Sequence, residues 1–155
     1  MGGSQVTVAT ASDPARFPLL LLDTHVLVWS VEDNPRLGPR AKHAINRAAR
    51  EERVAVSAIT PWEIALLVSK GRLKLTADVM EWLRAALSLS GVRLSPLEPE
   101  IAVASTRLPW EMHADPADRI LVATARNLGA TLVTADHALL ELVGLGHFKG
   151  MDAEK

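Results

Sequence analysis

Acidic residues stand at four junctions between expected secondary-structure elements. They are Asp23 after the leucines 19–22, Glu63 after Pro61-Trp62, Asp118 after Asp115-Pro116-Ala117, and Asp136 after the segment 132–135. Carboxylates that meet in one place raise one another's pKa unless cations intervene. Hard oxygen ligands without cysteine suit Mg²⁺ or Mn²⁺, and such ions can turn water into a nucleophile for phosphoryl displacement. The four acids therefore predict a metal site.

Apolar strands and amphipathic helices alternate around these acids. We expect strands at 19–23, 54–57, 92–97 and 131–134, and helices at 24–31, 40–53, 61–70, 78–89, 99–108 and 116–128. Strands separated by helices require crossovers, and hence a mainly parallel sheet covered on both faces. The predicted fold class is therefore α/β, with a three-layer α/β/α arrangement. In such a sheet, acids after neighbouring strands converge on one crevice.

Each acid also has a structural explanation. Thr60 and Glu63 fit a capping box, in which Glu63 reaches back to the Thr60 amide. Asp115 fits a helix N-cap with Asp118 in the first turn, and Asp136 can cap a helix that begins at residue 137. Asp23 is harder to explain in this way, because four leucines deliver it from the core and an unpaired buried charge is costly. It needs a cation or another partner.

The composition fits one globular domain in a reducing compartment. The chain has 155 residues, of which 48% are apolar and 23% are charged. The absence of cysteine excludes disulfides and thiolate metal sites, and it suits the cytoplasm. No apolar run is long enough to span a membrane, so we expect a soluble protein. We expect a flexible leader at 1–17, a nuclease-like domain at 18–148 and a flexible tail at 149–155.

The net charge of −1 hides a possible segregation of charge. If five acids including Asp115 share one pocket, the 13 other acidic residues are outnumbered by 17 lysines and arginines. The remaining surface is then mildly basic. Because the chain has no tyrosine and only two phenylalanines, it lacks the aromatic platform on which single-stranded nucleic acids stack. Any nucleic acid is expected to be held by its phosphates.

Four fragments of the sequence resemble a known family. They are Leu22-Asp23-Thr24, the segment 57–64 (SAITPWEI), the segment 115–125 (DPADRILVATA), and Leu132-Val133-Thr134-Ala135-Asp136. In this order and spacing they look like the PIN-domain ribonucleases, and most of all like the VapC-type toxins of bacterial toxin–antitoxin pairs. The resemblance covers about residues 19–145, which is nearly all of the predicted domain.

The resemblance implies a single PIN-like α/β/α domain, often a homodimer, that cuts RNA with Mg²⁺ or Mn²⁺ and is inhibited by a cognate antitoxin. The implied catalytic acids and metal ligands are Asp23, Glu63, Asp118 and Asp136, with Asp115 as a further ligand or a helix cap. Thr24 and Thr134 are implied as hydroxyl neighbours. We therefore expect a metal-dependent endoribonuclease that is cytoplasmic and has no membrane partner.

Two other functions remain open from the sequence. The first is a catalytically silent PIN-like module that binds RNA or a protein through the same groove. The second is a dinuclear metallophosphoesterase, because Asp23-Thr24-His25 matches an Asp-x-His opening and His113 and His137 also lie near acids. The remaining motifs of that second family are absent from the sequence, so the three histidines are interpreted as residues at the rim of an acidic pocket.

Basic and aromatic residues give weaker signals. Arg40, His43, Arg47 and Arg50 form one polar stripe of a helix, which is either a phosphate track or a solvated face with an Arg47–Glu51 pair. Arg119 follows Asp118 directly and is expected to contact substrate phosphate or a neighbouring acid. The four tryptophans are expected in the core or at interfaces, with Trp62 as a candidate for a dimer contact.

Overall fold

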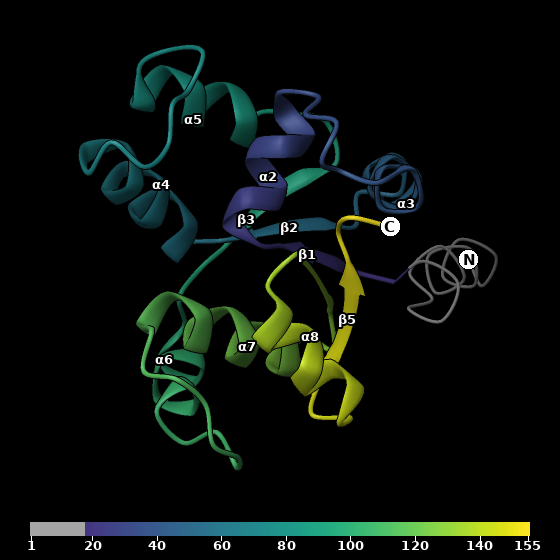
Figure 1. The fold of residues 1–155 in the computed structure, drawn as a ribbon, viewed down its shortest axis with the longest axis vertical. Coiled ribbons are helices and arrows are strands. Elements are labelled where there is room, and N and C mark those ends of the chain that lie inside the picture. The colour runs from purple at the N-terminus through teal and green to yellow at the C-terminus, as the bar shows by residue number, and fades with distance from the viewer. Residues whose placement is uncertain (1–17) are drawn as a thin grey trace, which may run out of the picture.

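Five parallel strands form the centre of the computed structural model, which describes residues 18–155 (Figure 1). Their order across the sheet is β3-β2-β1-β4-β5, and every neighbouring pair is parallel. The strands are β1 Leu20–Leu22, β2 Val54–Ser57, β3 Val92–Ser95, β4 Thr131–Thr134 and β5 Lys149–Asp152. The predicted mainly parallel sheet is thus confirmed, and the predicted leader at 1–17 lies outside the described residues.

Seven helices cover the two faces of this sheet within residues 18–155 (Figure 1). They are α2 Thr24–Val31, α3 Pro39–Arg50, α4 Ile59–Ser69, α5 Val79–Leu87, α6 Pro99–Ser105, α7 Pro116–Leu128 and α8 His137–Gly144. None of the helices in this part of the chain is long and apolar enough to cross a membrane.

Alternation along the strands produces the two apolar layers. Leu20 and Leu22 face a cluster that includes residues of α2, α3 and α5, whereas Leu21 faces a cluster with α7 and α8. Successive side chains of a strand point to opposite faces, so a strand buried on both sides must be apolar throughout. The leucine run at 19–22 meets that requirement, and it fixes β1 as the central strand of a three-layer α/β/α domain.

The strand order also determines where a site can form. From β1 the chain moves outward to β2 and β3, and it then crosses back to β4 on the other side of β1. The helices that follow β1 and β4 therefore leave toward opposite faces, which opens a crevice at the carboxyl ends of these two strands. Asp23 directly follows β1, and Asp136 lies two residues beyond β4.

The prediction of a flexible tail at 149–155 is wrong. Residues 149–152 form β5, which pairs with β4 from Thr131–Lys149 to Thr134–Asp152. The chain end is anchored as well, because the Gly38 and Arg40 amides donate to the carbonyls of Ala153 and Lys155 at 2.8 and 2.9 Å. The polar segment gives no strand-like periodicity, and its strand forms because β4 presents an edge to pair with.

The predicted capping box at Thr60 is also wrong. Helix α4 begins at Ile59, two residues earlier than predicted, and Ser57 Oγ accepts the Ile59 amide at 3.1 Å. Thr60 lies fully buried inside the first turn. Pro61 is tolerated there because the first amides of a helix have no intrahelical acceptor. Glu63 is therefore free for another partner.

Candidate active site

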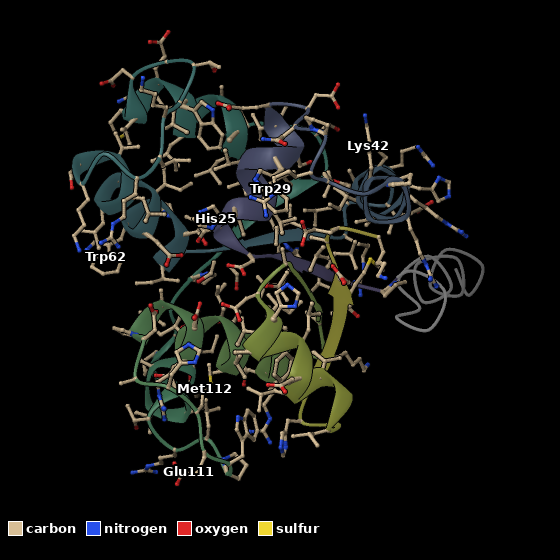
Figure 2. The ribbon with its side chains drawn as sticks, viewed as in Figure 1. His25, Trp29, Lys42, Trp62, Glu111 and Met112 are labelled. Carbon is tan, nitrogen blue, oxygen red and sulfur yellow. The ribbon has the colours of Figure 1, made fainter. Side chains whose placement is uncertain are left out.

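One cavity gathers all five acids that the sequence singles out. It has a volume of about 340 Å³ and is lined by Asp23, Glu63, Asp115, Asp118 and Asp136 together with His25, Trp29, Arg36 and Ala135. The acids come from the ends of β1 and β4, from the second turn of α4, and from the N-cap and first turn of α7. Figure 2 shows His25 and Trp29 on α2, the helix that begins directly after Asp23.

Asp23 is held at the carboxyl end of β1 by two threonines. Its Oδ1 accepts the Thr24 amide at 2.7 Å, and its Oδ2 accepts the Thr134 hydroxyl at 2.6 Å. Burial raises the pKa of Asp23 above its ordinary value of 3.8, although both hydrogen bonds oppose that shift and the charge of Asp136 adds to it. The negative charge is therefore costly here, and a cation would relieve the cost.

Glu63 faces the same cavity from α4. The buried Thr24 hydroxyl donates a hydrogen bond to Glu63 Oε1 across 39 positions of sequence. Burial raises the pKa of Glu63 above 4.5, and the charges of Asp23 and Asp115 raise it further. Thr24 thus links two acids, since its amide donates to Asp23 and its hydroxyl donates to Glu63.

Asp115 and Asp118 have different positions in the first turn of α7. Asp115 is the N-cap, and its Oδ1 accepts the Asp118 amide at 3.1 Å. Asp118 Oδ2 lies 2.7 Å from His113 Nε2, which donates to the ionised carboxylate. Burial raises the pKa of Asp118 from 3.8 to about 6, and nearby Asp23, Asp115 and Asp136 contribute to that rise. The capping interpretation of Asp115 is thus confirmed, and Asp118 is the more desolvated carboxyl.

Asp136 combines a structural contact with a place in the cavity. It is the N-cap of α8, and its Oδ1 accepts the Leu139 amide at 3.0 Å. The Thr134 hydroxyl accepts the Asp136 amide at 3.0 Å while it donates to Asp23. The second carboxylate oxygen of Asp136 accepts no hydrogen bond from residues 18–155, so it can bind a ligand without uncapping the helix.

Two arginines are placed differently from what the sequence suggests. The expectation that Arg119 contacts an acid is wrong, since it donates to the Ser105 carbonyl at 2.9 Å and to the Met112 carbonyl at 3.2 Å. It holds the segment before α7 in place. Arg36 does line the acidic cavity, although its sequence context is a turn with no motif. No local signal identifies it, because the loop meets the cavity only through the tertiary fold.

The other aromatic and basic side chains largely follow the expectations. Trp29 and Trp82 are buried, whereas 51% of Trp62 is exposed. Trp110 is stacked on His147 with ring centroids 4.4 Å apart. Arg40, Arg47 and Arg50 are exposed on α3, and the alternative Arg47–Glu51 pair does not occur among the ion pairs of residues 18–155.

The donor set fits a hard divalent cation. Five carboxylates share one cavity, and three of them have a raised pKa with burial as the largest cause. Within residues 18–155, no three Asp, Glu or His side chains lie in positions that could hold a metal ion as they stand. Their oxygens are instead engaged by hydroxyls, amides and His113. Oxygen ligands of this kind suit Mg²⁺ or Mn²⁺, which retain several waters and need few protein ligands.

The sequence and the fold are similar to those of known proteins. Residues 20–145 match the PIN domain family. The chain is 37% identical over 120 residues to Ribonuclease VapC22 of Mycobacterium tuberculosis, an alignment that covers 77% of this chain and 88% of that protein.

Solved structures give the same result for the fold. DNA-bound VapBC from Salmonella typhimurium has a TM-score of 0.63 at 17% identity, covering 87% of this chain and 98% of that one. FitAcB from Neisseria gonorrhoeae has a TM-score of 0.59 at 23% identity, with the same two coverages. The sequence fragments that resemble PIN domains are thereby confirmed as a family signature: this chain belongs to the PIN-domain family and is homologous to the VapC ribonucleases.

Proposed function

We propose that this protein is a Mg²⁺- or Mn²⁺-dependent endoribonuclease and the toxin of a toxin–antitoxin pair. The observation that carries the proposal is the convergence of five carboxylates in one cavity at the point where the strand order reverses. A capping role accounts for Asp23, Asp115 and Asp136, which are the N-caps of α2, α7 and α8, but not for Glu63 or Asp118, and it does not explain why all five carboxylates share one cavity. The homology to a VapC ribonuclease supports RNA as the substrate.

In the proposed mechanism, Asp23, Glu63, Asp118 and Asp136 hold one or two metal ions, and Asp115 lies beside them. A bound Mg²⁺ or Mn²⁺ supplies an activated water and offsets the charge that develops on the phosphodiester. The protein's own contribution is orientation. Thr24 and Thr134 fix the direction of the Asp23 carboxylate, and Thr24 also fixes that of Glu63. His113 holds Asp118 and keeps one of its oxygens in place.

The comparisons also support the expected partners. Structural neighbours include a complex described as a toxin–antitoxin complex from Klebsiella pneumoniae and VapBC2 from Rickettsia felis bound to a promoter DNA fragment. We propose that a small cognate antitoxin inhibits this chain in the cytoplasm. We also propose a homodimer, because half of the large apolar side chain of Trp62 is exposed on α4.

Cleavage of RNA with defined product ends tests the proposed function. The purified chain, freed of antitoxin, is incubated with a labelled single-stranded RNA and with a DNA of the same sequence in Mg²⁺ or Mn²⁺. We expect cleavage of the RNA and no 2′,3′-cyclic phosphate among its products, because water rather than the 2′-hydroxyl attacks phosphorus. The control is Glu63→Gln, purified in parallel, in which the Thr24 hydroxyl keeps its acceptor.

The result also decides between the enzyme and the silent binding module. RNA that is bound but never cut by wild-type protein would support the module. Cyclic phosphate ends, or equal cleavage by Glu63→Gln, would contradict the proposed chemistry.

Substitutions at Asp115 and Asp118 are expected to separate ligation from capping. Asp118→Asn should remove nearly all cleavage and leave folding intact, because Asn keeps the shape and the His113 contact. Asp115→Asn should keep much of both activity and stability, since Asn caps a helix almost as well as Asp. Asp115→Ala should lose about 0.5–2 kcal/mol of unfolding free energy.

Cleavage rates and melting curves of the three variants provide the measurement. An inactive Asp115→Asn together with an active Asp118→Asn would reverse the assignment of the third acid. If Asp115→Ala is as stable as the wild type, Asp115 does not stabilise α7 as its N-cap.

A further inference from the structure

Arg36 is the one permanently cationic residue among the described residues that line the acidic cavity. It lies in the loop between α2 and α3, outside every motif of the sequence. The five acids of the cavity would repel an incoming phosphate, and the metal ions alone must otherwise offset that repulsion. A guanidinium at the same cavity is placed to bind the phosphate of a nucleic acid backbone.

The loop that carries Arg36 is held at several points. The Asn34 side chain accepts the Arg36 amide at 2.9 Å, and the Asn34 amide donates to the Trp29 carbonyl at 2.9 Å. Leu37 is buried, and the Gly38 amide donates to the Ala153 carbonyl. Only glycine fits at position 38, because a Cβ there would lie 2.1 Å from the Lys155 carbonyl oxygen. The backbone under Arg36 is therefore fixed before any substrate arrives.

The side chain of Arg36 is oriented by stacking. Its Cζ lies 4.5 Å from the ring centroid of Trp29, which is buried on α2 and lines the same cavity. A cation–π contact with the indole restrains the guanidinium over the ring face. Figure 2 shows Trp29 on α2 close to His25, which also lines the cavity. The stack thus holds the cation beside the acids.

The donors of Arg36 are weakly engaged. Its Nη2 lies 3.5 Å from Glu154 Oε2, at the limit of a hydrogen bond, and 62% of its side chain is exposed. Glu154 itself is 41% exposed, so water screens this pair. The guanidinium therefore keeps most of its donors available for a ligand.

We infer that Arg36, stacked on Trp29, is a substrate-binding residue that contacts a phosphate of the RNA next to the cleaved bond. The inference rests on the proposed nuclease function and names a residue that acts beside the metal ligands. Arginine suits this role better than lysine, which can neither present a planar group to the indole nor donate two parallel hydrogen bonds. Glu154 holds the guanidinium loosely in the free protein and gives it up when RNA binds.

RNA binding by non-cleaving protein tests this inference. In an Asp23→Asn background, the affinity for a fluorescent single-stranded RNA is measured by anisotropy in Mg²⁺ over a range of salt concentrations. Arg36→Gln should weaken binding roughly tenfold, since it removes one charged hydrogen-bonding group. It should also reduce the salt slope by about 0.7, the value for one phosphate contact on a single strand. Arg36→Lys should recover the slope but only part of the affinity.

Two controls separate binding from structure. Arg84→Gln removes the same charge from the exposed face of α5, away from the cavity, and should bind RNA like the background protein. Glu154→Gln removes the partner of Arg36 but keeps the guanidinium, and it should not weaken binding. If Glu154→Gln is as defective as Arg36→Gln, or if Arg84→Gln is equally weak, Arg36 is not a specific phosphate contact.

The activity of the otherwise wild-type chain keeps the two proposals apart. We expect Arg36→Gln to raise KM for RNA far more than it lowers kcat. If the wild-type protein cuts RNA and Arg36→Gln binds RNA as tightly as its background protein, the inference about Arg36 is wrong and the nuclease proposal stands. Wild-type protein that cuts no RNA, with Arg36 still required for binding, overturns the nuclease proposal and retains Arg36 as an RNA contact.

Discussion

Removal of divalent ions is expected to abolish RNA cleavage and to lower the stability of the protein. After dialysis against EDTA, the chain should be inactive, and added Mg²⁺ or Mn²⁺ should restore cleavage. The physical reason is the negative charge of five carboxylates in one cavity. Within the described residues, only hydroxyls, amides, two histidines and Arg36 lie near enough to offset that charge. An ion that binds the folded state alone should also raise Tm in proportion to ln(1 + [L]/Kd).

The pH dependence gives this prediction a definite sign. The folded-state pKa of Asp118 is about 6, above its ordinary value of 3.8. Between these two values the native metal-free protein binds more protons than the unfolded chain, so its stability falls as the pH rises through that window. The raised pKa values of Asp23 and Glu63 act in the same direction. The stabilisation by Mn²⁺ should therefore grow from pH 4 to pH 7.

Melting curves at several pH values, with and without Mn²⁺, provide the measurement beside the cleavage assay. Asp23→Asn protein purified in parallel is the control for a contaminating ribonuclease, because a contaminant would cut RNA in both preparations. Cleavage that continues unchanged in EDTA and depends on Asp23 would contradict the metal requirement. A Tm shift that shrinks as the pH rises would contradict the carboxylates as its source.

Asp23→Asn is expected to lose at least a hundredfold in cleavage rate, roughly the effect of removing one preorganised electrostatic group from an active site. The variant should nevertheless melt at the same temperature as the wild type or higher when metal is absent. Its side chain can keep both contacts, because Oδ1 can accept the Thr24 amide and Nδ2 can donate to the Thr134 hydroxyl. The charge that burial disfavours is gone.

Asp23→Asn should therefore be at least as stable as the wild type without metal, and less stable than the wild type when metal is added. Without metal, the difference should be largest near neutral pH and vanish toward pH 3, where Asp23 is protonated in both states. With Mn²⁺, wild type should be stabilised more than the variant. Asp78→Asn is the matched control, since it makes the same change at an N-cap of α5 outside the cavity and should alter neither property. A destabilised but active Asp23→Asn protein would assign Asp23 a structural role.

Local sequence patterns determined most of the elements of this fold. The run of leucines at 19–22 specifies a strand buried on both faces, because each face of β1 meets a helical layer. The helix α7 was predicted with its observed bounds, since Asp115 and Pro116 provide a start and Gly129, at φ 63°, provides the stop. Such caps act within one turn, so the sequence alone displays them.

The partner of Glu63 and the last strand depended on contacts distant in sequence. Thr60, Pro61 and Glu63 form a good local capping signal, yet Ser57 starts the helix earlier and Thr24 takes Glu63 as a partner. Residues 149–152 form a strand only because β4 offers its edge. In both places a tertiary partner outweighed the local preference.

The candidate site divides in the same way. The sequence determined which residues carry its carboxylates, because each acid stands at a junction between predicted elements and the set matches the PIN-domain pattern. Only the tertiary structure decided that Asp115 and Asp118 play different parts, that Thr24 joins Asp23 to Glu63, and that Arg36 lies on Trp29 at the same cavity. The physical reason is that strand order sets which loops meet, and strand order follows from long-range packing that local periodicity does not encode.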